Sequence, residues 1–311
     1  MDLRTRSSTD RLDVGSALIR SSAEDRSVRR SAAAGHLVRL ARGCHVAREH
    51  WESADFDERF RLRIAAARAI SRRDPVLSHA AAAYVWNLPW IGPWPDLVSA
   101  TDPTRSSTRS GSLVRWHNAQ LAVGEVVRYH GVAVTTPTRT VVDLALSLSF
   151  AEAVAIADGA LHRAATTRAS LGACLLRRRD ARNAPSAGRV LAFAEAGAES
   201  AGESLSRVAI AESRIDVPVL QEAFHDGDGL IGFADFWWPR LGVVGEFDGD
   251  TKYLSPEFRG GRSVERVLLD EKKRADRIQA LPRVRRIVRW GWREARDPAL
   301  LARRLALPQG R

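Results

Sequence analysis

The chain has 311 residues, of which 45% are hydrophobic and 27% are charged, and it carries a formal net charge of +11 with a sequence pI of about 10.8. This apolar content excludes global disorder, and the length predicts two or three domains. The positive charge favours a polyanionic partner, with nucleic acid first and an anionic membrane second. In residues 262–311, 15 Lys or Arg stand against 6 Asp or Glu, an excess of 9 positive charges. A generally arginine-rich composition explains part of this surplus.

Cysteine usage and the N-terminal sequence indicate the compartment. Cys44 and Cys174 are far apart, and neither has a partner at metal-ligand spacing. One disulfide would add little to a chain of this size, so we expect reduced thiols. The start, MDLRTRSSTDRLDVG, has no apolar core for a signal peptide, and no run reaches membrane-spanning length. We therefore expect a cytoplasmic protein without a membrane partner, and the lack of a phosphate loop implies no nucleotide cofactor.

Residues 10–50 predict short helices followed by a basic hairpin. Ser22 is a possible helix cap, Gly35 a helix stop, and Gly43 suits a tight turn between alternating apolar and basic residues. Helix, helix and hairpin is the plan of a winged helix, in which the second helix enters a DNA groove and the hairpin touches the backbone. The arginines expected to contact DNA are Arg26, Arg29 and Arg30 on the helix and Arg39 and Arg42 on the wing. The alternative is a solvated basic face.

Residues 55–90 predict two helices broken near Pro75, with His79 at the start of the second. A lone histidine here is more often structural than a ligand. A strand, a polar loop and a second strand are expected over 97–121. Another strand then leads into helices, with Thr135 or Thr136 and Pro137 setting the first helix start. Arg139 and Asp143 are four apart and can pair across one helical turn, in an architectural or a functional role.

Three segments in the N-terminal part of the chain resemble a known family: LVRLARGCHV, SHAAAAYVWNLP and TTPTRTVVDLA. Together, over about residues 10–165, they resemble the AbiEi-type antitoxin family of actinobacteria. The most specific positions are Thr136, Arg139, Thr140 and Asp143. The resemblance implies an N-terminal winged helix, a middle α/β region and a role like that of autorepressors of toxin–antitoxin operons. A cognate toxin protein is then a possible partner.

The pattern changes after the Ala-, Gly- and Pro-containing stretch near residues 175–200. Residues 202–216 predict an amphipathic helix, 217–239 two strands joined by the turn DGDG, and 241–253 a further strand. A long helix, a final strand and a closing helix begun at Asp297 follow. We expect the tryptophans of this region to be packing residues, with base stacking as the alternative. They are Trp237, Trp238, Trp290 and Trp292.

Four carboxylates gather in this region. Glu246 and Asp248 are two apart and share a face of their strand, Asp235 lies on the preceding strand, and Glu203 approaches from the helix. Crowded carboxylates repel and raise one another's pKa unless a cation holds them. Oxygen ligands of this number suit Mg²⁺ or Mn²⁺. The alternative is an exposed turn whose acids pair with basic neighbours.

The segments ESAGESLSR, FADFWW and GEFDGDTKY, within residues 200–295, resemble the Vsr-like branch of PD-(D/E)XK endonucleases. The resemblance implies phosphodiester hydrolysis with a metal held by Asp235 and Glu246, and with Asp248 as a further ligand. The family's usual lysine would stand at position 248, so Lys252 is its expected replacement and the general base stays open. Glu203 belongs to the same implied catalytic set. The residues implied to position the DNA backbone are Lys272, Arg274 and Arg277.

The fold class we predict is α/β (α+β), with a winged-helix-like domain, a middle α/β region and a restriction-endonuclease-like domain. The expected ranges are 1–55, 56–170, 171–199 as linker or helix, and 200–311. The first hypothesis is a DNA-binding protein with a Mg²⁺- or Mn²⁺-dependent endonuclease domain. The second is a transcriptional regulator or antitoxin whose nuclease fold binds without cutting, and the third is a scaffold that binds another protein.

Overall fold

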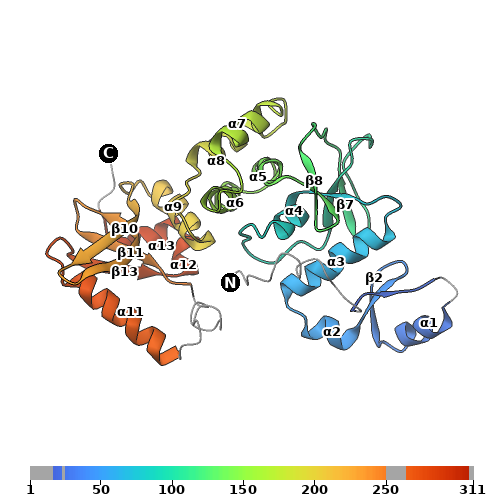
Figure 1. The fold of residues 1–311 in the computed structure, drawn as a ribbon, viewed down its shortest axis with the longest axis horizontal. Coiled ribbons are helices and arrows are strands. Elements are labelled where there is room, and N and C mark those ends of the chain that lie inside the picture. The colour runs from blue at the N-terminus through green and yellow to red at the C-terminus, as the bar shows by residue number, and fades with distance from the viewer. Residues whose placement is uncertain (1–16, 23–24, 250–263, 308–311) are drawn as a thin grey trace. The chain divides into compact units, whose positions relative to one another are not determined.

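The computed structural model describes residues 17–22, 25–249 and 264–307. The chain splits into two compact units (Figure 1). The N-terminal unit contains residues 17–147 and 166–187, and the C-terminal unit contains residues 148–165 and 188–307. Helices and mixed sheets occur in both units, so the protein has an α/β fold. In the part of the chain described, no helix has the length and apolar character needed to cross a membrane.

The N-terminal unit begins with a small sheet in the order β1-β3-β2, in which β2 and β3 form the predicted hairpin. Asp25 caps the helix α1 by accepting the backbone N–H groups of Ser27 and Val28 at 3.1 and 3.2 Å. Gly43 sits in the hairpin turn with φ of +75°, and a Cβ there would lie 2.8 Å from the carbonyl oxygen of Ser21. Only glycine fits this turn. The elements are β1 (Ile19–Arg20), α1 (Arg26–Ala33), β2 (Leu37–Ala41), β3 (Cys44–Ala47), α2 (Arg48–Ser53) and α3 (Phe56–Ile70).

A second sheet of the N-terminal unit has six strands in the order β6-β7-β5-β4-β9-β8. Helix α4 starts at His79 and α5 at Pro137 with Thr136 as its cap, both as the sequence predicts. The helices α3, α4 and α5 contribute buried apolar side chains to the core under this sheet. The elements are β4 (Val76–Leu77), α4 (His79–Val85), β5 (Val98–Thr101), β6 (Arg109–Ser110), β7 (Val114–His117), β8 (Val126–Tyr129), β9 (Val132–Thr135), α5 (Pro137–Ala145) and α7 (Arg168–Leu176).

The C-terminal unit is built on a four-stranded sheet in the order β10-β11-β12-β13. The first three strands are antiparallel, and β13 lies parallel to β12. The helix, three strands, helix and strand expected from the sequence are all confirmed. The elements are α6 (Phe150–His162), α9 (Ala201–Glu212), β10 (Val219–Asp226), β11 (Gly229–Trp238), β12 (Val243–Phe247), α11 (Val264–Gln279), β13 (Arg286–Trp290), α12 (Trp292–Ala295) and α13 (Pro298–Leu305). The helix α8 (Ala184–Phe193) runs across the boundary of the two units.

Two helices cover the two faces of this sheet. Val244 packs with Ile278 of α11, whereas Phe247 lies so close to Gly202 of α9 that a Cβ on that glycine would be 2.0 Å from the ring. Successive residues of a strand point to opposite faces, so α11 and α9 lie on opposite sides of β12. Glu246 therefore points to the α11 side.

Aromatic side chains fill much of the C-terminal core, as expected. Trp237, Trp238 and Trp290 are buried and Trp292 is half-buried. The indole N–H of Trp290 donates to Ser206 Oγ of α9 at 2.7 Å, and that of Trp238 donates to a backbone carbonyl. Their polar atoms are thus satisfied inside the unit, which is typical of packing residues.

Candidate functional site

Glu246, the central acid of the sequence hypothesis, is held by two arginines. Its side chain is only 8% exposed at the end of β12. Nη2 of Arg274, from α11, donates to Oε1 at 2.7 Å. Nε of Arg289, which faces Glu246 in the parallel pair β12–β13, donates to Oε2 at 2.8 Å. Each carboxylate oxygen therefore accepts a charge-assisted hydrogen bond.

Asp248 lies two residues after Glu246 in the chain, and Asp235 lies on β11, the strand that pairs with β12. Oδ2 of Asp235, on β11, accepts the backbone N–H of Phe247 at 2.8 Å. Asp248 follows the end of β12, and its own N–H donates to the carbonyl of Trp290 at 2.8 Å. The structure thus brings Asp235 to the residue next to Glu246, on the neighbouring strand.

Glu203 has a local role at the start of α9. Its Oε2 accepts the N–H of Glu199 at 2.9 Å, and its Oε1 accepts the hydroxyl of Ser200 at 2.7 Å. Ser200 in turn caps the helix by accepting the N–H of Glu203 at 3.2 Å. Oε2 also accepts from Gln221 of β10 at 3.2 Å. This reciprocal arrangement stabilises a helix N-terminus.

These side chains do not fit a divalent metal as they are arranged. Mg²⁺ needs several oxygen ligands converging at about 2.0–2.1 Å. Among the described residues, no three Asp, Glu, His or Cys side chains lie together in a way that could hold a metal ion. Both oxygens of Glu246 are held by guanidinium groups instead. Lys252, the proposed catalytic cation, lies outside the described residues.

The arginines predicted to contact DNA near the N-terminus are all exposed. Helix α1 has no buried residue. It carries three of the arginines, and the β2–β3 hairpin against which it packs carries two. The five are Arg26, Arg29, Arg30, Arg39 and Arg42.

The basic residues predicted on α11 differ from one another. Lys272 is exposed, Arg274 binds Glu246, and Arg277 forms a doubly hydrogen-bonded pair with Asp226 of β10, at 2.8 Å from Nε and 2.7 Å from Nη2. Two of the three are therefore engaged within the unit.

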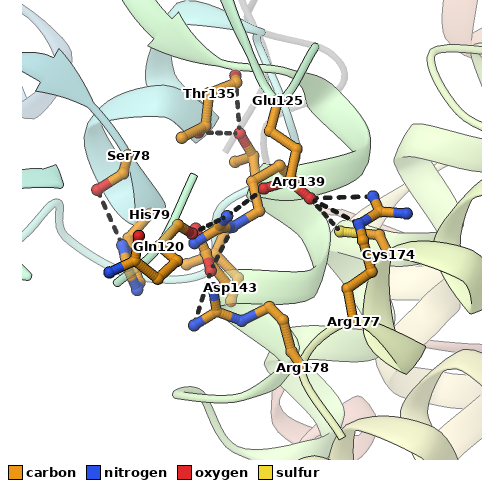
Figure 2. A network of polar contacts seen from close by, with 12 residues as sticks. Ser78, His79, Gln120, Glu125, Thr135, Arg139, Asp143, Cys174, Arg177 and Arg178 are labelled. Atoms are coloured by element: carbon orange, nitrogen blue, oxygen red, sulfur yellow. Dashed lines mark hydrogen bonds and ion pairs between the residues drawn. The ribbon is translucent and has the colours of Figure 1, made fainter. Parts of the chain in front are cut away.

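A second polar cluster lies in the N-terminal unit around Arg139, which is 1% exposed (Figure 2). Its Nε donates to Asp143 Oδ1 at 2.9 Å, which confirms the predicted pair. Its Nη1 donates to Glu125 Oε2 at 2.5 Å and to the carbonyl of Gln120 at 2.8 Å. Arg177 Nη2 donates to the other oxygen of Glu125 at 2.9 Å. Sequence reasoning missed Glu125 and Arg177, because they lie 14 and 52 residues from the groups they bind and no local spacing links them.

The charges of this cluster are balanced locally. Burial alone would raise the pKa of Glu125, but the N–H of Ala122, the hydrogen bond of Arg177 and the charge of Arg139 outweigh it and lower the pKa to about 2. Glu125 is therefore ionised at neutral pH. Arg139 of α5 thus binds Glu125, the residue just before β8, as well as Asp143 of its own helix. This contact between two segments of the unit is a structural role.

Two histidines stack beside this cluster. The rings of His79 and His117 are 3.7 Å apart and nearly parallel, at 15°. His79 has a left-handed backbone with φ of +48°, and Nδ1 of its ring contacts Ser78 Oγ at 3.0 Å. Burial, followed by the charges of Arg139 and other arginines, lowers the pKa of His79 to about 3. Burial also lowers the pKa of His117 to about 3, so both rings are neutral at pH 7.

Comparison with known proteins gives a partial relationship. No family model matches the chain. Two curated relatives from Mycobacterium tuberculosis are each 30% identical to it over 129 residues: "Uncharacterized protein MT2308" of strain CDC 1551 / Oshkosh and "Uncharacterized protein Rv2248" of strain ATCC 25618 / H37Rv. The match covers 42% of this chain and 48% of each relative, so the chain spans about half the length of the curated relatives it matches. No solved structure matches the chain.

Proposed function

We propose that this protein is a DNA-binding regulator that contacts DNA through α1 and the β2–β3 hairpin and does not cut it. One observation carries the proposal: α1 buries no residue and exposes three arginines next to a hairpin that exposes two more. Helices usually bury one face, so a short helix whose exposed side chains are mainly arginine and serine suits a groove of DNA. Arginines of this kind bind phosphates and base edges.

The connectivity of this region supports the same proposal. The β2–β3 hairpin directly after α1, with β1 paired to β3, agrees with the helix-and-hairpin part of the winged-helix plan. In that plan the hairpin contacts the phosphate backbone. Among described residues 17–22 and 25–36, α1 is the one helix before the hairpin, whereas the sequence predicted two. The net charge of +11 agrees with a polyanionic partner. The antitoxin role implied by the sequence resemblance adds a toxin protein as partner, and that part of the proposal rests on the resemblance alone.

The test is the salt dependence of DNA binding. We expect the triple variant Arg26→Ala, Arg29→Ala, Arg30→Ala to bind DNA more weakly and to lower the slope of log K against log salt by about 3, roughly one for each phosphate that is no longer neutralised. The control removes three exposed arginines elsewhere in the same unit: Arg72, Arg73 and Arg109. Equal weakening in both triple variants would refute a specific role for α1. Footprinting on DNA upstream of the protein's own gene tests the regulatory role.

Metal-dependent cleavage is the second candidate function. It is favoured by Asp235 and Glu246 lying on neighbouring strands of the helix–three strands–helix–strand unit whose segments resemble PD-(D/E)XK nucleases. Cleavage through a metal on Glu246 would require Arg274 to leave that carboxylate. The test is a plasmid cleavage assay with the purified protein and Mg²⁺ or Mn²⁺. If wild type cuts the plasmid and Glu246→Ala does not, nuclease activity is favoured over DNA binding without cleavage.

A further inference from the structure

The two arginines on Glu246 carry together the same charge as the divalent ion that the sequence predicted there. Asp235 and Glu246 together contribute two negative charges, and Arg274 and Arg289 contribute two positive ones within 2.7 and 2.8 Å of the Glu246 oxygens. A divalent ion placed between the two acids would bring the same charge. At Glu246, the central ligand of the predicted metal site, the negative charge is therefore compensated by side chains of the chain itself.

The position of Arg274 is fixed from three sides. Besides Glu246 on β12, its Nη1 donates to the carbonyl of Phe233 on β11 at 2.9 Å. Gly232 has φ of +152°, and a Cβ there would lie 3.1 Å from Cδ of Arg274. The backbone of β11 thus leaves room for this side chain to cross toward β12. Arg289 is set by its register opposite Glu246 and by a hydrogen bond from Arg304 to its carbonyl at 2.9 Å.

We propose that Arg274 and Arg289 permanently take the place of a divalent ion, so that this end of the sheet binds a phosphodiester group without metal. The side chain of Arg274 is 29% exposed and that of Arg289 is 40% exposed, although Nη2 of Arg289 is itself buried. Guanidinium groups match the geometry of phosphate oxygens and need no metal to do so. Glu246 is the positioning residue that fixes both. The phosphodiester as ligand rests on the proposed DNA-binding function; the replacement of the ion does not.

The first experiment measures Mn²⁺ uptake by electron paramagnetic resonance on the full chain without DNA. We expect wild type and Glu246→Gln to bind the same amount of Mn²⁺, because the arginines already occupy Glu246. Arg274→Gln, which takes one positive charge off Glu246, should bind Mn²⁺ at least about tenfold more tightly than wild type. The double variant Arg274→Gln, Glu246→Gln should return to the wild-type level. The matched control is Arg277→Gln, one turn further along α11, which removes the same charge from Asp226 and should not increase Mn²⁺ binding.

Three results would overturn the replacement: Mn²⁺ bound by wild type but not by Glu246→Gln, no tighter binding in Arg274→Gln, or equally tighter binding in Arg277→Gln. If Arg274→Gln fails to fold, Arg274→Met keeps the apolar part of the side chain and serves in its place.

The second experiment measures DNA binding in EDTA. We expect wild-type affinity to equal that in Mg²⁺ at matched ionic strength, and Arg274→Gln and Arg289→Gln each to lower the salt slope by about 1. Unchanged slopes would overturn the phosphodiester contact. No DNA binding by wild type would overturn both the proposed function and this ligand, while the Mn²⁺ result would still decide whether the arginines replace the ion.

Discussion

Arg139 and Asp143 stand one turn apart on α5, and Nε of the arginine lies 2.9 Å from Oδ1 of the aspartate with each side chain 1% exposed. The same guanidinium also binds Glu125, which Arg177 holds from the other side. A buried arginine that neutralises two carboxylates cannot be removed without leaving both short of a partner.

We therefore expect Arg139→Met to destabilise the fold by about 3–5 kcal/mol, because it takes the nearest cation from the buried Asp143 and leaves Glu125 with Arg177 alone. Arg139→Lys should recover little of this, since one ammonium group cannot reproduce the separate Nε and Nη1 contacts. The control is Arg128→Ala in the same unit, whose pair with Asp74 is 68% exposed on the arginine side and should be worth at most about 1 kcal/mol. Urea unfolding measures both; equal destabilisation would contradict a structural role for the buried network.

The stacked histidines predict a loss of stability in mild acid. The pKa of His79 and that of His117 are each about 3 in the fold, below the ordinary value of 6.5. Their contribution is fully present above pH 6.5. It falls as the pH drops from 6.5 toward 3, because over that range the unfolded chain takes up protons that the folded chain refuses.

The expected slope is at most about 1.4 kcal/mol per pH unit for each ring, because the unfolded chain binds at most one proton more than the folded chain at each histidine. Denaturant midpoints measured between pH 7.5 and 4.5 test this. The double variant His79→Asn, His117→Gln should have a flatter profile, and asparagine tolerates the left-handed backbone at position 79. The exposed His36→Gln is the control. A wild-type profile no steeper than that of the double variant would exclude a role for this pair.

Both cysteines should resist thiol reagents in the folded protein. Cys44 and Cys174 are 2% and 0% exposed. Burial raises the pKa of each thiol, and with the added charge of Glu125 that of Cys174 reaches about 11. The reactive thiolate is therefore scarce as well as inaccessible. An aromatic disulfide reagent should detect almost no thiol in native protein and both cysteines after denaturation in guanidinium chloride; rapid labelling of the native chain would argue against this packing.

Local signals in the sequence predicted most of the helices and strands. Thr136 with Pro137 and Asp297 with Pro298 mark helix starts where the structure has them, because a capping side chain and a proline act within one turn. The alternation of apolar and basic residues around Gly43 predicts the β2–β3 hairpin, and it too is a local signal. Such features need no knowledge of distant residues.

Contacts between residues far apart in the chain could not be predicted from local sequence patterns. An acid near a strand end suits a metal or an arginine equally well, and the arginines on Glu246 come from 28 and 43 residues further along the chain. Likewise α6, expected in the middle region, belongs to the C-terminal unit, where its buried Asp158 binds Arg207 at 2.6 Å over a separation of 49 residues.

Two helical glycines should respond to the same substitution with opposite signs. A Cβ on Gly202 would meet Phe247 at 2.0 Å, whereas a Cβ on Gly172 of α7 would meet nothing within 4 Å. Replacing a helical glycine by alanine ordinarily stabilises by about 1 kcal/mol, because it restricts the unfolded chain and improves helix propensity. That stabilisation should appear in full for the exposed Gly172→Ala. In Gly202→Ala the ring of Phe247 has to move out of the contact between α9 and β12, which costs about 1–3 kcal/mol from overpacking and leaves a net destabilisation. Thermal unfolding of the two variants distinguishes the effects, and a stabilised Gly202→Ala would mean that α9 does not pack on β12 this closely.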